Sequence, residues 1–429
     1  MLARQLISPY PQDAFMRISE KNKHRFIIAT LVILVRTCVG LIWASAGPLL
    51  SLIMQEYGIS RGTVSWYASV VAIVMATFAV PVGIIGMRTG AKRIFAVGAF
   101  LQSSCIIAPF CSSFGALLLT RVLFAVGSAM TTPIAASIYS EWFDTRELPL
   151  VNGVTMAFVT LGNALAFVAT IPIATALSWQ LALTLYGIIA LASALAWLLW
   201  GRERQKVTVD DPLGNEEPPI NIKSVFRHRA TVVFALSLVG PFTLSTAMGF
   251  WLPTYYHEVF GMPLATASSI TAILTVTGAI ACLIGGILPM RLGLRKPFLL
   301  IPGLLMGLVA LGCLMFNNPA IILVSVALFG IFSSIQTASI FTIPMELPGV
   351  TPRTGAVVLT LALSVGNVGG FMGPLIVGYL ADLTGSYMPG LIICCALSLS
   401  LFVGGVLLPE TGPRAKKVTG KRILQGKLP

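Results

Sequence analysis

Two arginines lie inside long apolar runs of this chain, where a charge is costly. Arg36 falls within the run 26–53, and Arg121 falls within the run 115–140. An arginine side chain stays protonated in proteins, so each is a permanent positive charge at membrane depth. No Asp or Glu lies in the middle of either run. Two interpretations follow: the guanidinium groups attract an anionic solute, or they bind backbone carbonyls and bridge helices.

Other polar and aromatic side chains lie at similar depth. Asn163 and Asn367 fall near the middle of the fifth and eleventh apolar runs, and Gln336 falls in the tenth. Each amide offers two donors and an acceptor, either to a solute or to a neighbouring helix. Trp43 and Trp251 could line a central cavity, or Trp251 could belong to an interfacial aromatic belt. The candidate substrate-binding residues are therefore Arg36, Trp43, Arg121, Asn163, Trp251, Gln336 and Asn367.

The apolar runs predict an all-α membrane protein. Hydrophobic residues make up 56% of the 429 residues, charged residues only 10%, and the mean hydropathy is +0.90. A chain in water could not hide that much apolar surface. Apolar runs of about 20 residues, the length that a helix needs to cross a bilayer, recur along the chain. They are 26–53, 63–87, 94–112, 115–140, 150–176, 180–200, 230–256, 265–290, 298–316, 319–343, 354–381 and 388–408.

The net charge of +13 does not indicate a nucleic-acid-binding protein, because its placement follows a membrane topology. Lys and Arg gather in every second loop between the apolar runs, which places them on one side of the membrane. Arg61 is the lone basic residue in the loops of the other side. The positive-inside rule then places both termini in the cytoplasm of a protein of the plasma (inner) membrane. The expected parts are a cytoplasmic tail 1–25, a six-helix bundle 26–200, a cytoplasmic linker 201–229, a second bundle 230–408 and a basic tail 409–429.

One short segment occurs twice, each time between two apolar runs. The first copy contains Gly83, Arg88, Gly90 and Arg93, and the second contains Gly286, Arg291, Gly293 and Lys296. Each residue of the second copy stands 203 positions after its counterpart, and Gly58 and Gly261 share that offset. A fixed offset near half the chain length predicts two related halves in the same orientation. We expect the two repeated loops to act as conformational switches.

These motifs resemble those of the major facilitator superfamily. The two loops are similar to that family's signature after its second helix, G-x-x-x-D-[RK]-x-G-[RK]-[RK], although Met87 and Met290 replace the acidic residue. The segment from Arg121 to Gly127 and the glycine-rich segment from Gly366 to Pro374 are also similar to family motifs. The resemblance implies twelve helices in two pseudo-symmetric bundles that rock around a central site. Arg36, followed by Gly47-Pro48-Leu49, is similar to the cyanate and nitroimidazole permease branch; an organic-anion branch stays open.

We therefore expect a secondary active transporter, not an enzyme, that moves a small organic or inorganic anion by alternating access. Without a carboxylate in mid-span, coupling in the manner of a symporter would use a proton carried by the substrate, or there is none. The alternatives are an efflux carrier for lipophilic compounds and a non-transporting membrane receptor. The seven cysteines lack the spacing of metal ligands, so we expect no cofactor or metal. The partners expected are a small-molecule substrate and the lipid bilayer, with no nucleic acid, and the protein is expected to be a monomer.

Overall fold

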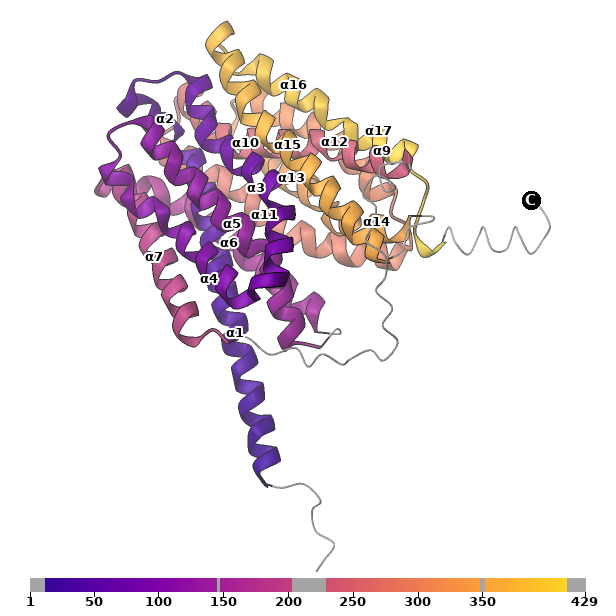
Figure 1. The fold of residues 1–429 in the computed structure, drawn as a ribbon. Coiled ribbons are helices and arrows are strands. Elements are labelled where there is room, and N and C mark those ends of the chain that lie inside the picture. Colours follow the sequence, from indigo (N-terminus) through magenta and orange to yellow (C-terminus); the bar gives the residue numbers. More distant parts are fainter. Residues whose placement is uncertain (1–11, 145–146, 203–228, 348–351, 415–429) are drawn as a thin grey trace, which may run out of the picture.

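The computed structural model describes residues 12–144, 147–202, 229–347 and 352–414, and these segments are helical almost throughout (Figure 1). The first half contains α1 (Gln12–Ala44), α2 (Ala46–Tyr57), α3 (Arg61–Thr89), α4 (Ala91–Gln102), the 3-10 helix η1 (Ser103–Phe110), α5 (Phe114–Trp142), α6 (Leu148–Ala176) and α7 (Trp179–Trp200). The second half contains α9 (Arg229–Ser237), α10 (Val239–Glu258), α11 (Leu264–Leu292), α12 (Pro297–Met315), α13 (Pro319–Ser334), α14 (Thr337–Glu346), α15 (Pro352–Thr384), α16 (Met388–Ser398) and α17 (Ser400–Leu407).

Twelve membrane-spanning segments result, as the apolar runs predict. Eleven runs of the described residues are long and apolar enough to cross a bilayer, and the 29-residue helix α3 completes the set. Five spans are two consecutive helices, because α1–α2, α4–η1, α9–α10, α13–α14 and α16–α17 each follow one another within a single apolar run. The sequence predicts the runs but not these interruptions. Helix α1 also begins at Gln12, inside the segment that was expected to be a tail.

The internal repeat is visible in the backbone. Helices α3 and α11 have the same length, and both bounds of α11 lie 203 residues after those of α3. The glycines at equivalent turns have positive φ angles: 59° at Gly58 and 66° at Gly261, then 89° at Gly90 and 66° at Gly293. Glycine adopts this backbone conformation at little cost, whereas other residues are strained there. The repeated glycines therefore mark repeated turns.

The two halves meet mainly through three helix pairs. Helix α3 packs on α15, α6 on α11, and α2 on α10, while the other large contacts stay within one half, as between α1 and α6 or α11 and α13. Figure 1 shows the halves at an angle: they converge near α2 and α16 and diverge toward the start of α1 and the end of α17. We call the converging end, which carries the turns after α2, η1, α6, α10, α12 and α15, the distal end.

The repeated turns allow a matched test of the backbone argument. Replacing Gly293 (φ 66°) with alanine should lower the free energy of unfolding by about 1 kcal/mol, because alanine is strained in the left-handed region. The measurement is thermal unfolding of the purified protein in detergent. Gly286→Ala is the control, since Gly286 lies inside α11 with nothing within 4 Å of an added Cβ. Equal melting temperatures for the two variants would contradict the assignment.

Candidate functional site

All three guanidinium nitrogens of Arg121 are hydrogen-bonded. Its three nitrogens donate to the carbonyls of Tyr67 (3.2 Å), Ile42 (2.6 Å) and Trp43 (2.7 Å). The same group lies 4.8 Å from the centre of the Tyr67 ring and 5.2 Å from that of Phe124. Two of the carbonyls belong to the last turn of α1, just before the break at Ser45. Arg121 therefore supplies donors to carbonyls at a place where the helix stops providing them.

Arg36 has one partner. Its guanidinium donates to the Thr132 hydroxyl on α5, and the side chain is 5% exposed. The other guanidinium nitrogens make no hydrogen bond within the described residues, and none of them is among the fully enclosed polar atoms that lack a partner. They therefore face space that water or a small solute can reach. The three ion pairs of the described chain involve Arg25, Arg61 and Arg295, so no carboxylate pairs with Arg36.

A third buried arginine shows how this chain handles such a charge elsewhere. Arg295 is 8% exposed, and two of its nitrogens donate to Glu346 at 3.2 and 3.0 Å. Burying a charge is costly unless it is paired or fully hydrogen-bonded. Arg295 is paired with an acid and Arg121 is bonded to carbonyls, whereas Arg36 keeps most of its donors free. Among the buried arginines of the described segments, Arg36 is thus the one whose side chain makes a single hydrogen bond.

Asn163 lies near Arg36. A Cβ atom added at Gly40 would lie 3.1 Å from the Asn163 Oδ1, and Gly40 is one helical turn after Arg36 on α1. That oxygen is buried without a hydrogen-bond partner. On α5, Tyr139 is close enough to interact electrostatically with Arg36, and its hydroxyl is 2.7 Å from that of Thr155. A charged group, an amide and hydroxyls are therefore gathered where α1, α5 and α6 meet.

The remaining candidates do not all join this group. Trp43 contacts Phe250 of the second half, with ring centres 6.0 Å apart, and it lies two turns beyond Arg36 on α1. Trp251 is fully buried and donates to the Pro374 carbonyl at 3.0 Å, so it joins α10 to α15. Gln336 lies between α13 and α14, donates to the Ser333 carbonyl and keeps a buried, unpaired Oε1. Asn367 is half-buried on α15.

Sequence reasoning missed Thr132 and Tyr139. They are seven residues apart on α5, a spacing that places two residues on the same side of a helix. A search for polar residues at helical spacing within the fourth apolar run would have found them. Such a search would not have identified Arg36 as the partner of Thr132, because the two residues lie 96 positions apart in the chain.

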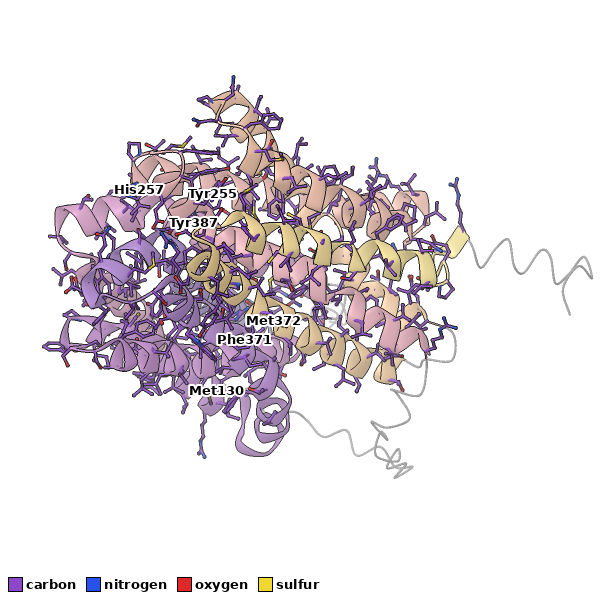
Figure 2. The ribbon with its side chains drawn as sticks, turned by 90° about the horizontal axis from the view of Figure 1, so that it is seen from above. Met130, Tyr255, His257, Phe371, Met372 and Tyr387 are labelled. Carbon is purple, nitrogen blue, oxygen red and sulfur yellow. The ribbon has the colours of Figure 1, made fainter. Side chains whose placement is uncertain are left out.

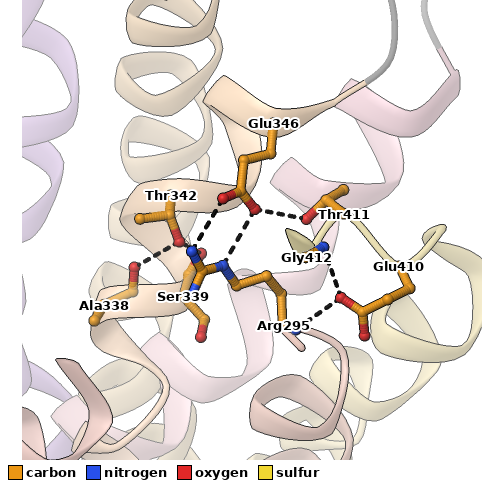
Figure 3. Close-up of polar contacts among 8 residues, drawn as sticks. All are labelled: Arg295, Ala338, Ser339, Thr342, Glu346, Glu410, Thr411 and Gly412. Carbon is orange, nitrogen blue, oxygen red and sulfur yellow. Dashed lines mark hydrogen bonds and ion pairs between the residues drawn. The ribbon is translucent and has the colours of Figure 1, made fainter. Parts of the chain in front are cut away.

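The second copy of the repeated loop is held in place by hydrogen bonds to Glu410 and Glu346 (Figure 3). The Glu410 carboxylate accepts from the backbone N–H of Arg295 at 2.7 Å and of Lys296 at 3.0 Å, and Thr411 donates to Glu346. The Lys296 ammonium donates to the Val406 carbonyl, while Arg291 is exposed. Residues 409–414, placed by sequence in the tail, are therefore docked on this loop.

The first copy of the loop is described only in part. Helix α3 contains Gly83 and Arg88, but the surroundings of these two side chains lie outside the described residues. Gly90 turns the chain from α3 into α4, and Arg93 is exposed. What the two copies share in the structure is thus the glycine turn.

Twelve spans in two repeated halves, with polar groups buried among them, define a membrane solute transporter rather than an enzyme. The chain belongs to the Major Facilitator Superfamily, whose sequence profile matches residues 32–351 and again 264–425. This family and its bacterial relatives support the expectation of a multi-pass protein of the plasma membrane that acts on a small molecule.

Two sequence relatives cover most of the chain. One is the probable sulfoacetate transporter SauU of Cupriavidus necator, 23% identical over 390 residues, or 84% of this chain and 89% of the relative. The other is the nitrite extrusion protein of Bacillus subtilis, 24% identical over 370 residues, or 85% and 89%.

Solved structures show the same fold. The D-xylose-proton symporter gives a TM-score of 0.74 at 13% identity, covering 90% of this chain and 98% of that one. A bacterial homologue of the human lysosomal transporter Spinster, in an inward-facing and occupied conformation, gives 0.71 at 17% identity, covering 90% and 94%.

The contrast between the two arginines predicts different effects on stability. Arg121→Leu should lower the free energy of unfolding by about 3 kcal/mol, because it removes three hydrogen bonds and leaves buried carbonyls unpaired. Arg36→Leu removes one bond and a buried charge, so it should be neutral or stabilising. Thermal unfolding in the same detergent compares them. A larger loss for Arg36→Leu than for Arg121→Leu would contradict these roles.

Proposed function

We propose that the protein transports a small anion that binds to Arg36. The observation that carries this proposal is the buried guanidinium with one hydroxyl partner and no carboxylate. An anion would supply the missing charge and accept the free donors, and hydrogen bonds of this charge-assisted kind are short and strong. Asn163 and Thr132 would complete the site from α6 and α5.

The names of the relatives support an anion as well. Sulfoacetate carries a sulfonate and a carboxylate, and nitrite is a small inorganic monoanion. All of these oxygens accept hydrogen bonds, and the planar fork of a guanidinium matches two neighbouring oxygens of either group. An exporter of lipophilic cations would need acidic groups instead of Arg36.

We further propose alternating access between two bundles, 26–200 and 230–408, with the distal end outside and both termini in the cytoplasm. The halves touch at the distal end and diverge toward the other end, as expected for a carrier closed to the outside. Rocking of the bundles would then expose the Arg36 site to each side in turn.

Coupling to a proton would run through the substrate itself in this proposal. Glu56, Glu258 and Asp382 lie at the distal ends of their spans, so they are remote from Arg36. A substrate with two acidic groups can carry one proton and still keep a negative charge for Arg36, so no titratable residue is needed at the site. We propose that the working unit is a monomer, since the site is built from one chain.

Uptake into proteoliposomes tests the anion site. Arg36→Ala should raise the KM for nitrite, nitrate or sulfoacetate, whichever the wild type transports, by about 100-fold, through the loss of charge-assisted hydrogen bonds. Arg36→Lys keeps the charge but not the fork, so a rise of about tenfold is expected.

The control for uptake is Arg202→Ala, which removes one exposed positive charge from the end of the first half. It should transport as the wild type does. Unchanged uptake and KM in both Arg36 variants would remove the anion proposal. Stabilisation of the wild type, but not of Arg36→Ala, by the same anions in a thermal-shift assay would support it independently.

A further inference from the structure

Arg61, the lone basic residue among the distal connections, reaches from the first half to the second. It is the first residue of α3, and its guanidinium lies 2.8 Å from the Glu258 carboxylate at the end of α10. Its Nε donates to the Tyr387 hydroxyl at 2.7 Å, and that hydroxyl donates to the same Glu258 carboxylate at 2.8 Å. The three side chains form a closed triangle of hydrogen bonds across the interface between the halves.

Tyr387 is suited to both of its bonds. Burial and the neighbouring Glu258 charge raise the pKa of its hydroxyl, so it keeps its proton and can donate to the carboxylate while accepting from Arg61. Its ring packs beside that of Tyr255, with centres 6.1 Å apart (Figure 2), and lies 5.2 Å from the Arg61 guanidinium. The second half thus holds this phenol in place for Arg61.

A fourth side chain caps a helix of the opposite half. The two Asp382 oxygens, at the end of α15, accept from the backbone N–H of Arg61 at 3.0 Å and of Gly62 at 2.7 Å. These N–H groups belong to the first turn of α3, where no intrahelical acceptor exists and where a negative charge is favoured. The neighbouring Ser60 caps the Thr63 N–H of the same turn, and Asp382 adds a second cap from 321 positions away.

The two helices are in close contact at this point. A Cβ atom added at Gly378 would lie 1.9 Å from the Ser65 hydroxyl oxygen and 2.6 Å from the Arg61 carbonyl oxygen. Beside it, Trp66 donates to the Tyr379 hydroxyl at 3.1 Å, and its ring lies 5.6 Å from that of Phe371, which Figure 2 labels. Helix α3 therefore packs closely against α15 at the distal end. Separating the two helices breaks all of these hydrogen bonds together.

We propose that Arg61, Glu258, Asp382 and Tyr387 form a latch that holds the distal ends of the two halves together, and that its strength sets the population of the distally open state. We call these four residues the distal latch. Each of its polar bonds between the halves must break when the distal end opens, and an ion pair and a helix cap are lost at once. The inference rests on the proposed rocking of the bundles but not on the identity of the solute.

The test measures the separation of the distal ends. Spin labels are placed on cysteines at Ser112 and Asn317, which are exposed distal residues of the first and second halves. Cys111 and Cys282, the two free cysteines that are not buried, are replaced by serine. Electron double resonance on the full chain in lipid nanodiscs then gives the distance distribution. Arg61→Gln should increase the ratio of long-distance to short-distance populations about fivefold, which corresponds to about 1 kcal/mol.

The chain offers a matched control. Arg25 and Glu147 form an ion pair of similar exposure, 26% and 37% against 37% and 27% for Arg61 and Glu258, but within the first half. Arg25→Gln should therefore leave the distances unchanged. Glu258→Gln and Asp382→Asn, which keep the side-chain shape, should each move them as Arg61→Gln does. The latch is overturned if these three variants keep the wild-type distribution, or if Arg25→Gln shifts it equally.

Discussion

A positive charge at membrane depth must find a partner, and the architecture of this transporter follows from how it does so. Lipid headgroups are too far away, so the partner has to be a carbonyl, an acid, water or a solute. The chain uses a different solution at each of its three buried arginines, two of which lie within spans while Arg295 lies in the loop between α11 and α12. Arg121 occupies the broken end of α1, Arg295 meets Glu346, and Arg36 keeps most of its donors open. The three charges thus differ in what surrounds them, not in residue type.

Backbone symmetry and chemical asymmetry coexist in this molecule. The repeat reproduces helix bounds and glycine turns at an offset of 203 residues, as α3 and α11 show. The positions that match Arg36 and Arg121 at that offset are Val239 and Val324. The second half therefore supplies the same scaffold without the charges, and it contributes aromatic contacts such as Phe250 against Trp43.

Much of the fold could be predicted from the sequence, because span length and turn glycines are local properties. The twelve runs and the repeated turns at Gly90 and Gly293 depend on residues close together in the chain. The role of Arg121 could not be predicted, since its carbonyl partners lie on α1 and α3, 54 to 79 residues away in the chain. Nor could the partners of Arg61, which come from three segments up to 326 residues away. The amino-acid sequence shows where a charged residue lies, but not which groups surround its side chain.

The anchoring of the second loop by Glu410 has a consequence for biosynthesis. The backbone N–H groups of Arg295 and Lys296, in the turn before α12, donate to a carboxylate that lies 115 and 114 residues further along the chain. A ribosome adds that residue only after all the later spans have been made. Until then this turn lacks its acceptor, so the second half reaches its final form only when translation is nearly over.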